Sequence, residues 1–317
     1  MAPEKSNVTV KSLYDLLVAP PPPREYWVAK GVLPKSAIMV FGGVPKAGKS
    51  YVGLNMCRNL VLGEPLFGNK DLLVNPAKVL LVDQEVGELG LYERCSPLFS
   101  DLDQTGLGLL NDRLLYCSRQ RGLEVTTPEG QQLFYDVVGF YKPEVLVLDP
   151  IGKLFHGDEN RNDEVGRLFD FLDDMIDFGK DWGLSVVIVH HFKKPPVNDF
   201  SRKGFDALDP MNFRGSSRWY ADPDSLLTVD RQENYPTPWK AWKLHGRFEL
   251  RHGPGFDGFA MSINRNNDSR VMWEGDISPK EPQGLPDLKM SGFGGGGQKQ
   301  DDDGGEGKPG LRTFKRI

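Results

Sequence analysis

The chain has 317 residues, of which 39% are hydrophobic, so it can form one large domain with appendages or two small domains. No apolar run approaches the ~20 residues that span a bilayer, and the N-terminus lacks the basic start and apolar stretch of a secretory signal, so we expect a cytoplasmic protein without membrane association. The net charge of -5 does not favour nucleic acid for the surface as a whole, although basic loops gathered on one face could still bind it.

The first predicted elements form a lead-in and then a strand and a helix. Residues 1–36 make up the lead-in, with a short helix at 12–18 and an extended polyproline stretch at Pro20 to Pro23. The apolar run at 37–42 ends in glycine and predicts a buried strand. Apolar spacing over residues 50–62 predicts a helix that ends at Gly63.

Alternating strands and helices continue from there to residue 191. Strands are predicted at 78–85, 113–117, 144–150 and 184–191, and helices at 87–99, 128–141 and 164–178. This alternation predicts an α/β fold, with a mostly parallel twisted sheet and helices on both faces. After a long loop at 192–213, shorter strands at 225–230, 240–245 and 259–264 fit a short antiparallel edge.

Two compositional features complete the outline of the chain. Residues 37–274 are predicted to form one domain, whereas the Gly- and Asp-rich tail at 275–317 cannot bury enough apolar surface to fold and is predicted to be disordered. The cysteines Cys57, Cys95 and Cys117 lie far apart and form no CxxC pair. They indicate reduced core residues, and neither a zinc site nor a disulfide framework.

A phosphate-binding loop lies between the first predicted strand and helix. The segment GVPKAGKS at 43–50 matches GxxxxGK[ST] in full. Its glycines let backbone N–H groups turn toward phosphate oxygens, and the helix start adds partial positive charge. We expect Lys49 to bridge the β- and γ-phosphates and Ser50 to ligate Mg²⁺. The predicted nucleotide contacts are Gly43, Val44, Pro45, Lys46, Ala47, Gly48, Lys49, Ser50 and Tyr51.

Carboxylates end two of the predicted strands. Asp149 closes the run at 145–148, and a carboxylate at the carboxyl end of a buried strand lies in the crevice where ligands bind, so we expect it to hold Mg²⁺ through water. Asp83 and Glu85 end the second predicted strand. Glu85, at the strand exit, is the candidate for accepting a proton from the attacking water, while Asp83 lies deeper and has a supporting role.

These motifs together resemble the RecA-like P-loop ATPases. The resemblance rests on the phosphate loop, Glu85, LVLDP at 146–150, VIVHH at 187–191 and FRGSS at 213–217, and it covers roughly residues 24–265. Within that group the chain resembles the hexameric replicative helicase branch, DnaB-like and RepA-like, which includes stand-alone plasmid and phage ATPases.

The resemblance implies roles for further residues. Lys49 and Glu85 match catalytic residues, Ser50 and Asp149 match the metal site, and either His191 or His190 matches a sensor of the γ-phosphate. The strand-end position favours His191. Lys243 and Arg247 resemble a lysine–arginine pair that acts on the neighbouring subunit's nucleotide. Their spacing is wider than the usual K-x-R, so Arg251 is an alternative to Arg247.

Two segments fall where this family has its DNA-facing loops, at 157–163 and 192–213. The second carries basic residues interleaved with Phe192, Phe200 and Phe205, the combination of charge and stacking surface that single-strand binding needs. The alternative is a solvated flexible loop. The predicted DNA-binding residues are Lys193, Lys194, Arg202, Lys203 and Arg214, and Arg214 is also a candidate for contacting the neighbour's nucleotide.

The resemblance implies an ATP-dependent DNA helicase or translocase that acts on single-stranded DNA in replication. It would hydrolyse ATP with Mg²⁺ at the subunit interfaces of a homo-oligomeric ring, a hexamer by analogy, and recruit replication proteins through its C-terminal tail. Two alternatives remain open at this stage. One is a RecA-type recombination ATPase that forms filaments, and the other is a non-motor regulatory ATPase.

Overall fold

A computed structural model describes residues 11–192, 206–213, 215–231, 242–263 and 267–277. The helices are α1 (Leu13–Val18), α2 (Lys49–Leu62), α3 (Gly87–Leu98), α4 (Gln104–Arg113), α5 (Pro128–Tyr141), α6 (Asn162–Phe178) and α8 (Arg218–Ala221). The strands are β1 (Tyr26–Val28), β2 (Leu33–Pro34), β3 (Ile38–Gly43), β4 (Val79–Asp83), β5 (Leu114–Ser118), β6 (Val145–Asp149), β7 (Ser185–His191), β8 (Ser225–Arg231), β9 (Trp242–Leu250), β10 (Phe256–Ile263) and β11 (Val271–Asp276).

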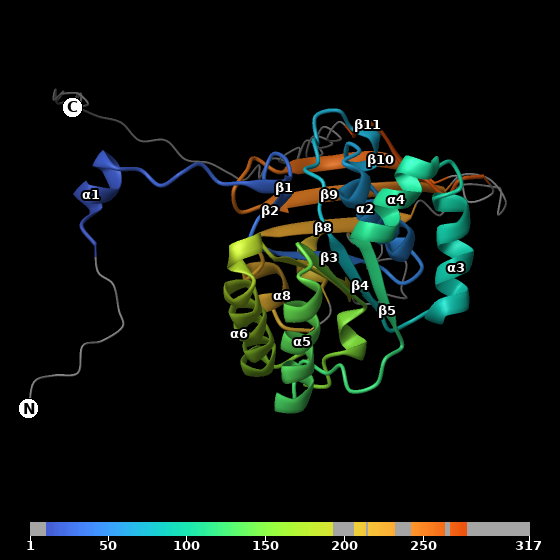
Figure 1. The fold of residues 1–317 in the computed structure, drawn as a ribbon. Coiled ribbons are helices and arrows are strands. Elements are labelled where there is room, and N and C mark those ends of the chain that lie inside the picture. Colours follow the sequence, from blue (N-terminus) through green and yellow to red (C-terminus); the bar gives the residue numbers. More distant parts are fainter. Residues whose placement is uncertain (1–10, 193–205, 214, 232–241, 264–266, 278–317) are drawn as a thin grey trace, which may run out of the picture. The chain divides into compact units, whose positions relative to one another are not determined.

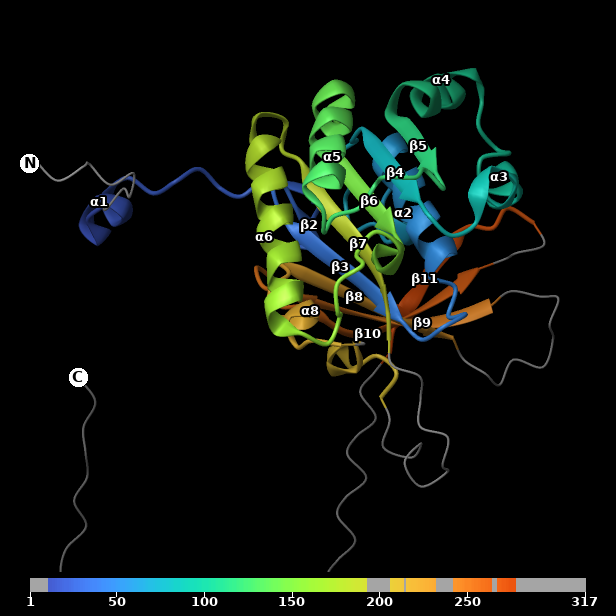
Figure 2. The same cartoon turned by 90° about the horizontal axis from the view of Figure 1, so that it is seen from below.

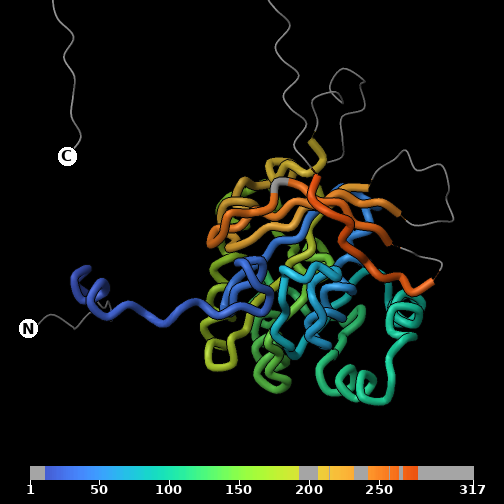
Figure 3. The backbone as a smooth tube through the Cα atoms, turned by 90° about the horizontal axis from the view of Figure 1, so that it is seen from above, coloured from blue at the N-terminus to red at the C-terminus, as the bar shows by residue number. Residues whose placement is uncertain are grey.

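The main sheet has nine strands in the order β11-β10-β9-β8-β3-β7-β6-β4-β5 (Figure 1). Every pairing from β8 to β5 is parallel, and every pairing from β8 to β11 is antiparallel. Seen from above, the antiparallel strands form one end of the sheet, and the teal helices α3 and α4 lie toward the other (Figure 3). The predicted α/β fold, with a mostly parallel sheet and an antiparallel edge, is confirmed.

Strand β8 corrects one detail of that prediction. It was expected in the antiparallel edge, but it pairs in parallel with β3, with Met39 opposite Ser225. Between β7 and β8 the chain runs through more than thirty residues, including α8, and a connection of that length allows a crossover into a parallel strand. The antiparallel edge therefore begins at β9.

Two apolar layers cover the faces of the sheet, because the parallel strands alternate their side chains between them. On β3, Phe41 points to the layer that contains α2, α3 and α4, and Val40 points to the layer that contains α5 and α6. Helices α5 and α6 lie side by side (Figures 1 and 2) and join through Tyr135, whose ring contacts Phe171 and Phe178 edge-on. Within the described part of the chain, no helix has the length and apolar character to cross a membrane.

Helix α2 is buried along most of its length, including polar residues that tie it to other segments. The Asn55 side chain donates to the carbonyl oxygen of Ser269 and accepts from the backbone N–H of Val271, at the start of β11. Cys57 is buried in the same helix, as expected, whereas Cys95 and Cys117, which were also expected in the core, are only partly buried. These contacts fix α2 between the sheet and the segment that leads into β11.

Arg58 provides the strongest of these ties. Its guanidinium is 1% exposed and binds Glu64 at 2.9 Å and Asp101 at 2.7 Å. Arg270, beside β11, binds the same two carboxylates, at 3.0 and 3.3 Å. The network joins α2 to the α3–α4 connection and to the final strand.

Arg58→Met should lower the free energy of unfolding by about 3 kcal/mol, because it leaves carboxylates partly buried without their main partner. Urea unfolding followed by circular dichroism measures this change. The control is Arg167→Met on the exposed face of α6, where we expect a change within about 0.5 kcal/mol. Equal, small effects of the two substitutions would contradict a stabilising network around Arg58.

Candidate nucleotide-binding site

The phosphate loop connects the end of β3 to the start of α2, the strand–loop–helix setting that the motif requires. A Cβ at Gly43 would lie 2.2 Å from the carbonyl oxygen of Val229 on β8, so glycine is required where the loop leaves the sheet. Lys46 and Gly48 have φ values of 65° and 94°, and such left-handed turns can direct backbone N–H groups into an anion-binding concavity. No side chain caps α2 at Gly48, so the positive end of the helix is open to a phosphate.

Lys49 is the buried cation of this loop. Its side-chain Nζ donates to the carbonyl oxygens of Gly43 and Val44, each at 3.0 Å. Burial lowers the pKa of Lys49 to about 8, while the nearby charges of Asp149 and Glu85 raise it. A buried ammonium whose hydrogen bonds go to neutral carbonyl oxygens can still bind an anion, and this arrangement suits phosphate binding.

Asp83 and Asp149 lie side by side, because β4 and β6 are parallel neighbours whose register pairs these two residues. Both therefore reach the carboxyl edge of the sheet, where the phosphate loop also begins. Burial, together with the charges of Glu85 and Asp83, raises the pKa of Asp149 to about 7. Arg94 and Lys49 act in the opposite direction. The edge thus concentrates negative charge beside the loop.

Ser50 and Asp149 line one small cavity at this edge. A hydroxyl and a carboxylate, completed by phosphate oxygens and water, form a donor set that Mg²⁺ commonly takes in nucleotide sites. Within the described ranges, no group of three His, Cys, Asp or Glu side chains could hold a metal without such added ligands. The raised pKa of Asp149 means that a cation beside it would relieve repulsion, so these residues fit Mg²⁺ bound together with a nucleotide.

The carboxylate of Asp83 is fully engaged in shaping the turn after β4. It accepts hydrogen bonds from the backbone N–H groups of Glu85, Val86 and Gly87 and from the hydroxyl of Ser118. The Glu85 side chain is exposed, and its charge affects the pKa of both Lys49 and Asp149. Of the two carboxylates that the sequence left open, the geometry favours Glu85 as the acceptor of a proton from water.

Arg94 is a residue of this site that the sequence analysis did not identify. It lies on α3, lines the cavity beside Asp149, and has its guanidinium carbon 5.7 Å from the centre of the Tyr51 ring. Its charge lowers the pKa of Asp149. The signal in the sequence is its spacing from the buried residues Leu91 and Leu98, which places a cation on the inward face of α3.

The two histidines at the end of β7 have different surroundings. His190 is 3% exposed, and its ring stacks on Trp219 with centroids 4.1 Å apart. His191 pairs in register with Gly43, where the phosphate loop begins, and strand alternation turns it toward the face that carries α2. The geometry therefore favours His191 as the candidate γ-phosphate sensor, and that role remains a prediction.

The basic residues of β9 point away from α2. Leu244 and Phe248 pack in the layer that contains α2, so Lys243 and Arg247, which alternate with them, lie on the opposite face of the sheet. Lys243 pairs with Glu274 at 3.4 Å. Both cations therefore lie across the sheet from the phosphate loop of their own chain.

The guanidinium groups of Arg247 and Arg251 have different partners. Arg247 pairs with the carboxylate of Asp206 at 3.0 Å. Arg251 donates to the backbone carbonyl oxygens of Ala221 and Asp222, at 2.7 and 2.9 Å, and so anchors the end of α8. Because Arg251 has this structural contact within its own chain, Arg247 remains the candidate for acting on a neighbour's nucleotide.

The loop at 157–163, which was predicted to face DNA, contacts the chain after residue 214. The backbone N–H of Ser216 donates to the carbonyl oxygen of Glu159 at 2.7 Å, joining the 157–163 loop to the segment after residue 214. A groove of about 500 Å³ is lined by residues 150–153, 155 and 157–160 together with His190, His191 and Trp219. The predicted DNA-binding residues Lys193, Lys194, Arg202, Lys203 and Arg214 lie outside the described residues.

Phe192 corrects one prediction about this region. It was expected to offer a stacking surface for bases, but it is 2% exposed and packs against Phe213, with ring centroids 4.7 Å apart. The short bridge between Phe192 and Phe213 holds the end of β7 against the following chain. Phe192 is therefore a core residue. Phe200 and Phe205 lie outside the described residues.

Residues 3–197, more than half of the chain, match the model of the AAA domain family, so the chain belongs to this family. The family, the phosphate loop and the mostly parallel sheet together define a P-loop ATPase. Among solved structures, the chain is similar to a KaiC-like protein from the hyperthermophilic archaeon Pyrococcus horikoshii, with 11% sequence identity and a TM-score of 0.46 over 76% of this chain and 90% of that chain. No curated protein matches the chain.

Glu85→Gln should keep nucleotide binding but slow ATP turnover by at least about a hundredfold, because the amide cannot accept a proton from water. Steady-state phosphate release with Mg²⁺ measures turnover, and a fluorescent ATP analogue measures binding. Glu88→Gln, at an exposed glutamate in the first turn of α3, is the matched control and should leave both unchanged. Normal turnover in Glu85→Gln would move the proposed role to Asp83.

Proposed function

We propose that this ATPase is a motor that acts on single-stranded DNA, as a translocase or helicase, and that it hydrolyses ATP between the subunits of a ring. The proposal extends the family assignment by naming a polymer substrate and a shared site. It rests on the position of the groove beside His191, which we take as the DNA-binding groove, relative to the nucleotide site. It also rests on the direction of the β9 cations.

Each residue of the site has a distinct part in the proposed hydrolysis. Lys49 would bind the β- and γ-phosphates, and Ser50 and Asp149 would hold Mg²⁺. Bound Mg²⁺ would neutralise charge on the phosphate oxygens. Glu85 accepts a proton from the water that attacks the γ-phosphate, and His191 contacts the γ-phosphate from the end of β7.

The observation that carries the proposal is the shared wall between the phosphate site and the groove. Pro150 follows the candidate metal ligand Asp149, and His191 is the register partner of Gly43, yet Pro150 and His191 both line the groove. A change at the γ-phosphate would therefore act directly on groove residues, through the ends of β6 and β7. This arrangement supports coupling between hydrolysis and a polymer held in the groove.

The β9 cations support a site shared between subunits. Lys243 and Arg247 lie across the sheet from their own phosphate loop. In a ring they would therefore contact the phosphates of a nucleotide that is bound to the neighbouring copy. The ion pairs with Glu274 and Asp206 would hold these side chains in place before assembly. A cation supplied by a neighbour stabilises the charge that develops during phosphoryl transfer.

Single-stranded DNA should raise the ATPase rate at least about tenfold at low salt, because binding in the groove would favour the arrangement competent for hydrolysis. The measurement is phosphate release with and without an oligonucleotide, with duplex DNA as the control. Absence of stimulation would favour the regulatory ATPase, and open filaments in electron micrographs would favour the recombinase. Rings that never separate a tailed duplex would exclude the helicase form.

Mixing two inactive variants tests the shared site. Lys49→Ala removes the phosphate contact, and Arg247→Ala removes the proposed cation, so each alone should lose most activity. In random mixed rings about a quarter of the interfaces would combine an intact loop with an intact cation, and activity should return in proportion. Arg251→Ala is the control, because Arg251 anchors α8 and this variant keeps both the phosphate loop and Arg247. It should therefore hydrolyse ATP by itself, without mixing. No recovery with Arg247→Ala would contradict action between subunits.

A further inference from the structure

An aromatic ring borders the phosphate loop on the side away from the candidate metal site. Trp242, the first residue of β9, lies on the face of the sheet that carries α2. A Cβ placed on Gly48 would lie 3.5 Å from its indole ring, which is ordinary van der Waals contact. Tyr51, in the first turn of α2, meets the same indole edge-on, with ring centroids 6.0 Å apart. Two aromatic side chains therefore flank the end of the loop.

Arg231 places a cation over this indole. It is the last residue of β8, and its guanidinium carbon lies 4.4 Å from the centroid of the Trp242 ring. A planar guanidinium stacks on aromatic faces, and a nucleobase offers the same flat shape with a π-face of its own. Because Arg231 is exposed, its side chain can move outward and close again over a base that stacks on the indole.

The order of the strands sets the direction in which a bound triphosphate would run. Strand β3, which leads into the loop, lies between β8 and β9 on one side and β7, β6 and β4 on the other. The candidate metal ligand Asp149 ends β6, so the metal and the γ-phosphate belong on the β6 side of the loop. The α-phosphate and the nucleoside would then leave the loop on the side of β8 and β9, where Trp242 lies.

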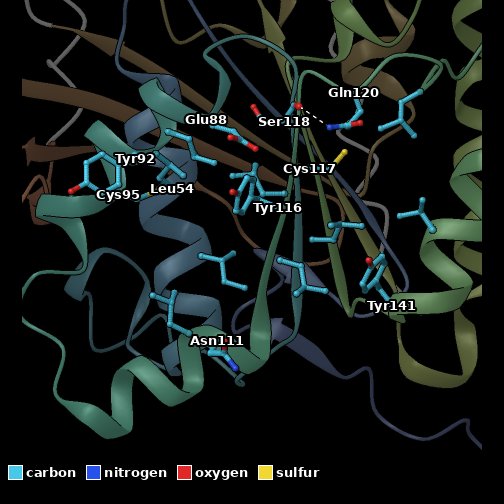
Figure 4. Close-up of a pocket in the computed structure, with 18 of the residues that line it drawn as sticks. Leu54, Glu88, Tyr92, Cys95, Asn111, Tyr116, Cys117, Ser118, Gln120 and Tyr141 are labelled. Carbon is cyan, nitrogen blue, oxygen red and sulfur yellow. Dashed lines mark hydrogen bonds between the residues drawn. The ribbon is translucent and has the colours of Figure 1, made fainter.

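A second aromatic surface lies in the other direction and is the alternative place for a base. An apolar groove of about 990 Å³ lies between α3, α4, β5 and α5, and Tyr92 and Tyr116 are among its lining side chains (Figure 4). In the order of the sheet, β5 follows β4 and so lies beyond the acidic edge. A base in this groove would reverse the triphosphate and carry the γ-phosphate away from Asp149 and Glu85.

We propose that the base of the bound nucleotide stacks between the indole of Trp242 and the guanidinium of Arg231, and that this stack makes the site selective for purine nucleoside triphosphates. Every base has a π-face, but a two-ring purine covers more of an indole than a one-ring pyrimidine does. The inference rests on the proposed nucleotide site and names the nucleoside that this site accepts. It does not depend on DNA or on a ring.

Comparison of a nucleotide with its bare phosphate chain tests the stack. Calorimetry on the full-length protein with Mg²⁺ measures the binding of a slowly hydrolysed ATP analogue and of inorganic triphosphate. Trp242→Ala should weaken binding of the analogue at least about tenfold, because the base loses its stacking surface. It should change binding of inorganic triphosphate by less than about twofold, since the phosphate loop is intact. Arg231→Gln should give a smaller loss, for the analogue alone.

Tyr116→Ala, in the groove at β5, is the matched aromatic control and should change neither affinity. Unchanged binding of the analogue in Trp242→Ala would overturn the proposal. Equal losses for the two ligands would also overturn it, because the indole would then only support the loop. A loss in Tyr116→Ala would place the base in the groove instead. Wild-type protein that binds neither ligand would refute the nucleotide site itself, and the stack with it.

Base selectivity gives a second readout. ATP and GTP should displace the analogue at concentrations at least about fivefold lower than CTP, because the purines stack over a larger area. Trp242→Ala should reduce this ratio to less than about twofold, whereas Trp242→Phe, which keeps an aromatic face, should retain most of it. A purine preference that survives Trp242→Ala would overturn the proposal.

Tryptophan fluorescence reports the stack directly. ATP should quench part of the emission of the wild type, and inorganic triphosphate should not. Trp242→Phe should abolish this quenching. Trp273→Phe is the matched control and should retain it, because Trp273 stacks on Phe259, with ring centroids 4.0 Å apart. Quenching that persists in Trp242→Phe would contradict a base on this indole.

Discussion

The packing of helix α2 is the constraint on which the site depends. Its apolar side chains lie on the sheet, Asn55 binds the segment that enters β11, and Arg58 binds Glu64 and Asp101. The first residue of this helix is Lys49, and the loop before it leaves β3 through Gly43, where no other residue fits. The position of the candidate phosphate site is therefore set by the core, on both sides of the loop.

The register of the parallel strands supplies the rest of the site. Asp83 lies opposite Asp149, and Gly43 lies opposite His191. Acidic and imidazole side chains that are far apart in the sequence therefore gather at one edge of the sheet. Burial lowers the pKa of Lys49 and raises that of Asp149, so it disfavours the charged form of both groups. An anionic phosphate and a divalent cation would relieve both penalties together.

The phosphate loop and Asp149 could be predicted from the sequence, because each follows an apolar strand whose pattern is unambiguous. Arg94 was missed because its position in the site depends on how α3 packs, which no local motif records. Helix α4 was missed because Gly106 and Gly108 lower its intrinsic helix propensity, and tertiary packing overrides that cost. The parallel direction of β8 depends on a crossover through residues 192–224, and the apolar pattern of a strand does not reveal its direction.

The β9 cations link the single chain to the proposed assembly, because they face away from their own phosphate loop. In the proposed ring these cations complete the chemistry of the neighbouring site.

The central claim is that α2, β4 and β6 together form a hydrolytic nucleotide site. An experimental structure with Mg²⁺ and a non-hydrolysable ATP analogue tests it most directly. The account predicts the γ-phosphate within hydrogen-bond distance of Lys49, the metal near Ser50 and Asp149, and Glu85 facing the γ-phosphate across one water. A nucleotide bound elsewhere, or Glu85 turned away with another carboxylate at the attacking water, would contradict it.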